Sequence, residues 1–276
     1  MIAIHNCRSA PTTSVRNPHR SAHITTSRQA GVRGQCEVGV TVVVVSLPTL
    51  SSIERLTLAR VTAVPDWHPE HATFEPFPVH AWVVRHPDGV ILVDTGIGTG
   101  NTVIDEWYRP EVISLHDALG SVRLEPTDIT AVVLSHLHFD HCGQQRMLDA
   151  PVFVQATEHT EAQSPRYTVA DWAAIPADRL RLVHGDEEIL PGIRLVATPG
   201  HTPGHQSVVI QTRDEPVVLA AQCAFRASEL LSGEPGPTNL HDESWRDAAC
   251  HSLARIRELG PATAHLSHDP QIVRLP

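Results

Sequence analysis

The stretch that most constrains this chain is residues 131–143, AVVLSHLHFDHCG. Its apolar first part, Ala131 to Leu134, predicts a buried strand. The residues after that strand are rich in metal-binding side chains: His136, His138, Asp140 and His141. Residues two apart in an extended chain point the same way, so His136 and His138 can share one target. Asp140 and His141 follow where the chain must turn, so they can face a neighbouring point.

Neutral imidazoles and a carboxylate are natural ligands for Zn²⁺ and similar divalent ions. Two ligand sets side by side predict two metal positions, roughly 3.5–4 Å apart when both are filled. The alternative for this stretch alone is a histidine-rich loop without metal, because the chain contains 19 histidines.

The composition limits the kinds of partner that the chain can bind. With 276 residues, 41% hydrophobic and 19% charged, the sequence is typical of a soluble globular protein. The formal net charge of −10 argues against nucleic acid, because phosphate binding needs a basic face. The longest apolar run, around Val42–Val45, is too short to span a membrane. We therefore expect neither nucleic acid nor a membrane as the partner; a small-molecule substrate is compatible with this composition, and the oligomeric state stays open.

The cysteines indicate a reducing compartment. There are five of them, and their spacing shows no pairing and no Cys-x-x-Cys motif: Cys7, Cys36, Cys142, Cys223 and Cys250. An odd, unpatterned set argues against a disulfide framework, so the expected location is the cytoplasm. The chain also has no lysine, which excludes a lysine-based covalent mechanism.

Residues 1–36 differ from the rest because they carry arginine, serine and threonine but no acidic residue. They lack the hydrophobic segment of a secretory signal, so we expect a disordered N-terminal extension. A transit peptide and a start codon assigned too early are the alternatives. Residues 37–276 are expected to form one folded domain.

Strands and helices alternate through both halves of that domain, which predicts an α/β fold of two related halves with sheet inside and helices outside. The expected strands are 38–47, 55–62, 80–85, 89–93, 131–134, 152–155, 207–211, 216–220 and 263–266, with two short strands within 189–197. The expected helices are 110–119, 157–163 and 242–259.

Two further features lie beside the expected metal site. Asp94 ends a predicted strand, where a carboxylate can orient a metal-bound histidine or cap the following turn. The loops 65–78 and 164–186 are long and are expected to form the pocket walls. Their aromatic residues line an acyl-chain groove or belong to the core: Trp67, Phe74 and Trp172.

Three motifs occur in the order found in the metallo-β-lactamase superfamily: Asp94-Thr95-Gly96, His136-x-His138-x-Asp140-His141 and Thr198-Pro199-Gly200-His201. Through them the chain resembles that superfamily over about residues 38–270. The resemblance implies an αββα sandwich of two mixed sheets flanked by helices, with the metals at one edge. It implies a first metal held by His136, His138 and His201. It implies a second metal held by Asp140, His141 and His268. His205 is left out of the ligand set.

Within the superfamily, the chain most resembles the N-acyl homoserine lactone lactonases, through Ser267-His268-Asp269-Pro270 and the segment from Tyr167 to Trp172. This resemblance implies hydrolysis of a lactone or related carboxylic ester by attack of a metal-bound hydroxide, with Asp140 as the catalytic residue that orients the water. Alternatives are a thioesterase similar to glyoxalase II, a β-lactamase, a mononuclear iron oxygenase and a metal-binding protein without hydrolytic activity.

Two residues depart from the lactonase pattern. Gln222 stands where the family places an aspartate that bridges both metals, so one or two Zn²⁺ ions are expected, with the second bound less tightly or dependent on a bridging hydroxide. Cys223 is the alternative ligand at that place, although its side chain should point to the opposite face of the strand. Phe225 stands where these lactonases have a tyrosine, and the loss of one oxyanion donor costs about 2.7–4 kcal/mol.

Overall fold

The structure is a computed structural model, and it describes residues 52–66, 68 and 71–276. The extension expected over residues 1–36 and the strand expected at 38–47 lie outside the described residues. From residue 52 onward, the chain shows the predicted alternation of strands and helices.

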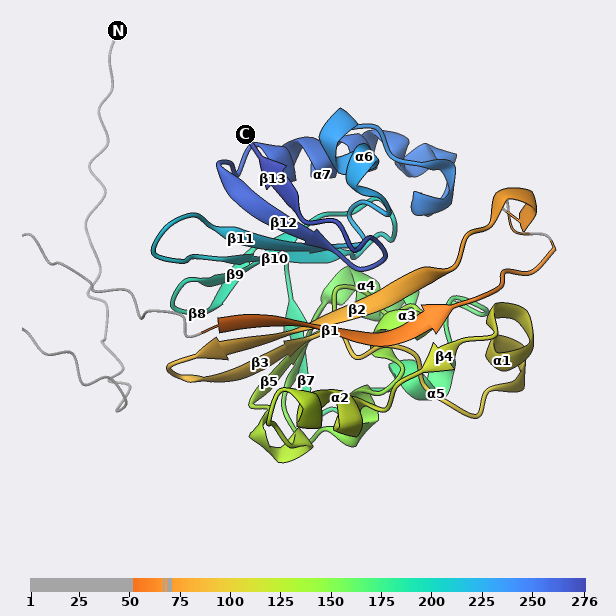
Figure 1. The fold of residues 1–276 in the computed structure, drawn as a ribbon, viewed down its shortest axis with the longest axis horizontal. Helices are drawn as coiled ribbons and strands as arrows, with labels where there is room; N and C mark the ends of the chain where they lie inside the picture. Colours follow the sequence, from red (N-terminus) through yellow and green to blue (C-terminus); the bar gives the residue numbers. More distant parts are fainter. Residues whose placement is uncertain (1–51, 67, 69–70) are drawn as a thin grey trace, which may run out of the picture. The chain divides into compact units, whose positions relative to one another are not determined.

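The described strands form two mixed sheets (Figure 1). The seven-stranded sheet has the order β4 (Glu111–Val112), β1 (Ser52–Val61), β2 (Phe77–His86), β3 (Gly89–Val93), β5 (Ala131–Val133), β6 (Val152–Gln155) and β7 (Leu180–Val183). The six-stranded sheet has the order β13 (Val273–Leu275), β12 (Ala262–Leu266), β11 (Val217–Ala221), β10 (Gln206–Ile210), β9 (Ile193–Ala197) and β8 (Glu187–Leu190). Strands β3, β5, β6 and β7 run parallel, as do β11 and β12, and the other pairs are antiparallel.

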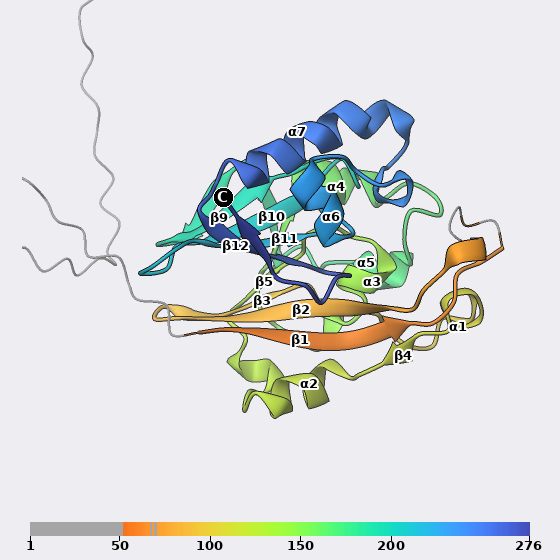
Figure 2. The same ribbon diagram turned by 45° about the horizontal axis from the view of Figure 1, so that its top comes forward.

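Helices cover the outer faces of both sheets. The α-helices are α1 (Thr102–Tyr108), α2 (Leu115–Ser121), α3 (Phe139–Cys142), α4 (Ala156–Glu161), α5 (Ala170–Ala173), α6 (Ala227–Ser232) and α7 (Arg246–Arg257). Short 3-10 helices are η1 (His71–Thr73), η2 (Pro126–Asp128), η3 (Gln145–Met147), η4 (Pro237–Asn239) and η5 (Glu243–Trp245). Figure 2 shows α6 and α7 over the six-stranded sheet and α2 beneath the seven-stranded one, which confirms the predicted αββα sandwich. Among the described helices, none has the length and apolar character needed to cross a bilayer.

Alternating side chains of β2 show how the layers are held together. Trp82 and Val84 are fully buried and pack between the sheets, against residues of β9 and β10 such as Leu195 and Val208. Val83 points to the other face and belongs to the cluster that includes Leu119 of α2. Period-two alternation with both faces apolar is the pattern of a strand that is covered on both sides.

Some predicted boundaries were wrong. The helix expected at 110–119 begins only at Leu115, because Glu111 and Val112 pair with β1 as a short edge strand and Ser114 caps the helix. Gly120 lies inside α2 and does not end it. The helix expected at 242–259 is shorter, since a 3-10 turn at Glu243–Trp245 precedes α7. Elements among the described residues that were not predicted are α1, α3, α5, α6, β4, β7, β13 and the short 3-10 helices.

The carboxyl ends of the parallel strands gather the residues singled out above. Asp94 follows β3, the loop with His136 follows β5, and α4 follows β6. In the other sheet Gln222 follows β11, and His268 comes two residues after β12. Parallel neighbouring strands end at the same edge, which is where α/β sheets place their binding sites.

Gly143 lies at the end of the loop that follows β5, and a substitution there tests how closely this loop packs on the chain after β3. A Cβ added there would lie 2.0 Å from the backbone nitrogen of Gly98, and backbone atoms cannot rotate away. We expect Gly143→Ala to lower the free energy of unfolding by about 1–3 kcal/mol. The matched variant is Gly120→Ala in α2, where a Cβ meets open space and helix propensity predicts a gain of about 0.5–1 kcal/mol. Urea unfolding of both variants checks the pair, and equal stability of the two would contradict the close contact at Gly143.

Candidate metal centre

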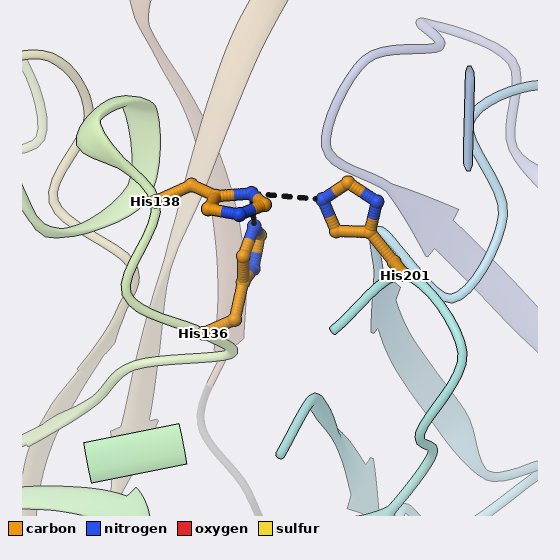
Figure 3. Close-up of side chains that lie close together, drawn as sticks. All are labelled: His136, His138 and His201. Carbon is orange, nitrogen blue, oxygen red and sulfur yellow. Dashed lines mark hydrogen bonds between the residues drawn. The ribbon is translucent and has the colours of Figure 1, made fainter. Parts of the chain in front are cut away.

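Three of the expected ligands come together from two loops that face each other (Figure 3). His138 Nδ1 lies 3.1 Å from His136 Nε2 and 3.0 Å from His201 Nε2. Two nitrogens bound about 2.0–2.1 Å from one tetrahedral Zn²⁺ would be roughly 3.3–3.4 Å apart. The three imidazoles therefore already stand at nearly the spacing that a single ion requires.

The other expected ligands form a second group, which contains Asp140, His141 and His268. The Nε2 atoms of His141 and His268 are 3.3 Å apart. Each of these nitrogens is 3.5 Å from Oδ2 of Asp140. The structure thus brings together all six sequence-predicted ligands, in the two sets of three that the resemblance implied.

The backbone after β5 explains how one short segment serves both groups. Extended chain carries His136 and His138, and the single-turn helix α3 begins directly after His138. The turn is closed at its start by a hydrogen bond of 3.0 Å from the His141 backbone N–H to the His138 carbonyl. Asp140 and His141 therefore lie beyond a turn and can face a neighbouring point, as the sequence predicted, while the His141 ring stays 4.0 Å from the His136 ring between centroids.

Asp94 fixes the orientation of His141. Its Oδ2 lies 2.9 Å from His141 Nδ1, which leaves Nε2 of that ring facing the second group. The same carboxylate accepts hydrogen bonds from the backbone N–H and the hydroxyl of Ser135, at 2.7 and 2.8 Å. Asp94 thus orients a histidine, one of the two roles left open by the sequence, and its other side-chain hydrogen bonds hold Ser135 after β5 instead of capping the turn that follows Asp94. It does so from a left-handed conformation with φ of 63°.

His205 lies behind the two groups and is a member of neither. Its Nδ1 is 2.8 Å from the hydroxyl and 3.1 Å from the carbonyl of Thr198. Its Nε2 accepts a hydrogen bond of 3.2 Å from the backbone N–H of Gln222. His205 therefore anchors the chain that presents Gln222.

Gln222 lies between the two groups. Its Oε1 is 2.9 Å from His268 Nε2 and 3.1 Å from His141 Nε2, whereas its Nε2 is 3.5 Å from His201 Nδ1. The residue before it, Ala221, has the unusual φ of 51°, which directs the chain toward the site. Cys223 is buried in the cluster shared with α6 and α7, so the alternative ligand points away, as its place on the strand predicted.

Burial determines the protonation state of four histidines of the two groups, which are His136, His138, His201 and His268. Loss of hydration, together with the charge of neighbouring histidines, lowers the pKa of each of these rings. The pKa falls to about 4 for His138 and to about 3 for His268. For His136 and His201 the pKa lies well below the usual range. These rings are therefore neutral at pH 7 and carry free lone pairs.

In two members of the second group, His141 and Asp140, nearby opposite charges outweigh the effect of burial on the pKa. Burial opposes charge on His141, but the carboxylates of Asp140 and Asp94 outweigh it and raise the pKa of this ring to about 10. Burial also opposes charge on Asp140, yet His141 and its hydrogen bond hold the pKa of that carboxyl well below its usual range. The second group thus keeps an ionised carboxylate, which suits a divalent cation.

A cavity of about 1190 Å³ opens onto both groups. Its floor includes His138, Asp140, His201, Gln222 and His268. Its walls come from both predicted loops, 65–78 and 164–186, from α1 and from the chain after β11. Their aromatic members include Phe74, Phe77, Trp107, Tyr108, Tyr167 and Phe225. Trp172 is a core residue instead, and Trp67 lies outside the described residues.

Comparison with known proteins agrees with this geometry. The sequence pattern of the Metallo-beta-lactamase superfamily matches residues 74–268, and the chain belongs to that superfamily. N-acyl homoserine lactonase AiiA of Bacillus thuringiensis subsp. kurstaki is 35% identical over 195 residues, which cover 66% of this chain and 76% of that protein. An N-acyl homoserine lactonase of Bacillus sp is 33% identical over the same shares of the two chains.

Solved structures extend the comparison to most of the described chain. A quorum-quenching N-acyl homoserine lactone lactonase superposes with a TM-score of 0.68 at 26% identity, covering 82% of this chain and 95% of that one. The resemblance inferred from the motifs is confirmed, and so is the expected enzyme class of metal-dependent hydrolase.

Proposed function

We propose that this chain is a zinc-dependent hydrolase of small molecules that contain a lactone or a related carboxylic ester. The observation that carries the proposal is the pair of ligand groups on the floor of an aromatic cavity. Relatives named N-acyl homoserine lactonases, which share a third of their residues with this chain over the aligned part, support a lactone as the substrate.

The donor sets suit zinc. His136, His138 and His201 would hold one ion, and three imidazoles leave a fourth position of a tetrahedral site open. Asp140, His141 and His268 would hold a second ion. When bound, Zn²⁺ supplies a Lewis acid for the substrate carbonyl and lowers the pKa of coordinated water toward about 7.

Side chains of the protein would orient the water, hold a ligand histidine in place and bind the substrate. Asp140 stays ionised and lines the cavity, so its carboxylate can accept a proton from a water molecule and orient that water. Asp94 keeps His141 in place from behind. The rings of Phe74, Phe77 and Phe225 exclude water from the apolar part of the cavity and offer contact area to an acyl chain.

In this proposal, Gln222 gives the two zinc positions different affinities. Its amide oxygen faces His141 and His268, so it can serve the second ion, but the amide brings no negative charge. Its NH₂ group faces His201 and offers no lone pair to the first ion. We therefore infer one tightly bound zinc at the three-histidine group and a second zinc of lower affinity.

A substrate screen of the zinc-loaded protein tests the function. N-acyl homoserine lactones of several chain lengths, a thioester and a β-lactam should be compared, with metal content measured on the same sample. We expect the lactones to be hydrolysed fastest, with one to two zinc per chain. Faster turnover of the thioester or β-lactam would replace the proposed substrate class, and one iron per chain without hydrolysis would favour the oxygenase.

The cytoplasm remains the proposed location, supported by cysteines that are free within the described residues. Cys142 and Cys223 are buried thiols, and Cys250 is partly buried. Burial raises the pKa of the Cys223 thiol to about 12, so this side chain is an unreactive part of the core.

Restoring a hydroxyl at Phe225 should increase the rate of lactone hydrolysis. The ring of Phe225 stacks on His268 with centroids 4.9 Å apart, and it lines the cavity. A hydroxyl on that ring can donate to the oxyanion, and such donors contribute about 10²–10³ in kcat where they are native. We expect Phe225→Tyr to raise kcat by about tenfold or more with little change in KM, measured by steady-state kinetics.

Phe74→Tyr is the matched control for this variant. Phe74 also lines the cavity, but its ring contacts Phe77, at 6.0 Å between centroids. An equal gain in both variants would show that the effect is general polarity of the cavity and not a donor beside His268.

A further inference from the structure

Glu158, on α4, is a fully buried carboxylate outside both ligand groups. It accepts four hydrogen bonds: from Leu137 N–H at 2.8 Å, Tyr167 hydroxyl at 2.5 Å, Thr202 hydroxyl at 2.7 Å and Gly204 N–H at 3.2 Å. Burial raises the pKa of this carboxyl, and the four hydrogen bonds oppose the shift. A buried carboxylate is costly to a fold unless hydrogen bonds compensate for its lost hydration, and here four donors do so.

Three of the four donors come from the two loops that carry the first ligand group. Leu137 lies between His136 and His138, and its N–H bonds to Oε1 of Glu158. Thr202 directly follows His201, and its hydroxyl bonds to Oε2. One carboxylate thus links the loop after β5 in one sheet to the loop between β9 and β10 in the other.

Close packing leaves this link little freedom. A Cβ added to Gly204 would lie 2.2 Å from the backbone nitrogen of Glu158 and 2.4 Å from its Cβ. The turn after His201 therefore rests directly on the first turn of α4. Because the contact involves backbone atoms, a shift of α4 must move this turn.

Tyr167 extends the link to the wall of the cavity. Its hydroxyl donates to Oε1 of Glu158, and its ring lies 4.9 Å from the ring of His138 between centroids. The same ring lines the cavity. A single carboxylate thus touches both ligand loops and one wall of the expected substrate site.

We propose that Glu158 is a positioning residue that sets the spacing between His138 and His201 and thereby the affinity of the three-histidine group for its ion. The proposal rests on the proposed metal-dependent function, since it assumes that this group holds zinc. Each carboxylate oxygen serves one loop, so a side chain with only one acceptor oxygen cannot hold both.

Glu158→Gln tests the proposal because it keeps the size of the side chain and replaces one acceptor by an NH₂ group. That NH₂ group must face N–H or O–H donors of one loop, so the loop is released. We expect the zinc dissociation constant of the tighter site to rise by about 10–100-fold, as for other residues that orient ligands. Competition with a chromophoric zinc chelator measures it without substrate, and the visible absorption of the Co²⁺-loaded protein should change as well.

Two further variants keep the test decisive if Glu158→Gln folds poorly. Thr202→Val removes one hydroxyl donor at nearly constant shape and should weaken zinc binding several-fold. Glu161→Gln, on the same helix, is the control, because the Glu161 carboxylate accepts a hydrogen bond of 3.5 Å from the nearby Ser164 hydroxyl, and this variant should leave the affinity unchanged.

The outcomes separate this proposal from the proposed function. Unchanged zinc affinity in both Glu158→Gln and Thr202→Val, with zinc bound by the unaltered protein, would overturn the role of Glu158 alone. Absence of zinc binding by the unaltered protein would overturn the metal centre itself. Loss of zinc affinity in these variants together with cooperative thermal unfolding of their metal-free forms would support positioning and exclude general misfolding.

Discussion

His136→Ala and His138→Ala are each expected to abolish zinc uptake by the three-histidine group and, with it, hydrolysis. Each histidine would supply one of three ligand nitrogens, and its ring nitrogen lies within 3.1 Å of a nitrogen of another histidine of the group. Two remaining imidazoles do not make a catalytic zinc site, which uses three protein ligands. Activity should fall by at least about a thousandfold, because Lewis-acid stabilisation of several kcal/mol is lost.

The measurements are zinc content per chain and the rate of lactone hydrolysis on the same preparations. His251→Ala is the control, since His251 is exposed on α7 and its Nδ1 lies 3.1 Å from the carbonyl of Asp247 on the same helix. It should keep both zinc and activity. Full activity in either His136→Ala or His138→Ala would rule out the proposed mechanism.

The local part of the site was predictable from the sequence because it lies in one short segment. The spacing of His136 and His138 and the turn before Asp140 follow from strand geometry and were found as expected. His201 and His268 were assigned by resemblance, because no local rule says that loops 63 and 127 residues away from His138 and His141 meet there. Their meeting depends on how two sheets pack.

Glu158 was not recognised from the sequence, although its neighbours were discussed. It stands in a short polar helix, Ala156–Glu161, where a glutamate is ordinarily a solvated residue. Its burial is a consequence of the loop after His201 folding over α4, a contact between distant parts of the chain. A glutamate three residues after the end of a buried strand was the available signal, and alone it is weak.

Errors in the predicted elements have a similar origin. Glu111 and Val112 carry no strand signal of their own and become β4 only because β1 offers an open edge. The helix α1 depends on a cap, in which the Asn101 side chain accepts from the backbone N–H groups of Val103 and Ile104. Short elements of this kind are decided by neighbours and caps, whereas apolar strands among the described residues, such as β3 and β6, have the predicted bounds.

Gln222→Asp is expected to tighten binding of the second zinc by about a hundredfold or more. The side chain lies beside His141 and His268 on one side and His201 on the other, so a carboxylate there can offer one oxygen to each ion. It also adds a negative charge, and two unit charges 4 Å apart attract by about 4 kcal/mol at an effective dielectric constant of 20. After desolvation of the carboxylate, a gain of about 2.7 kcal/mol corresponds to the hundredfold change.

The comparison of Gln222→Asp with Gln222→Asn separates charge from length, because asparagine has the shape of aspartate without its charge. Zinc titration against a chelator should show a tighter second ion in the aspartate variant alone. Without metal the new carboxylate lies near Asp140 and repels it, so the metal-free aspartate variant should unfold at a lower temperature and the zinc-loaded one at a higher temperature. Equal gains for asparagine and aspartate, or no change in the second dissociation constant, would show that the amide at position 222 does not limit the second ion.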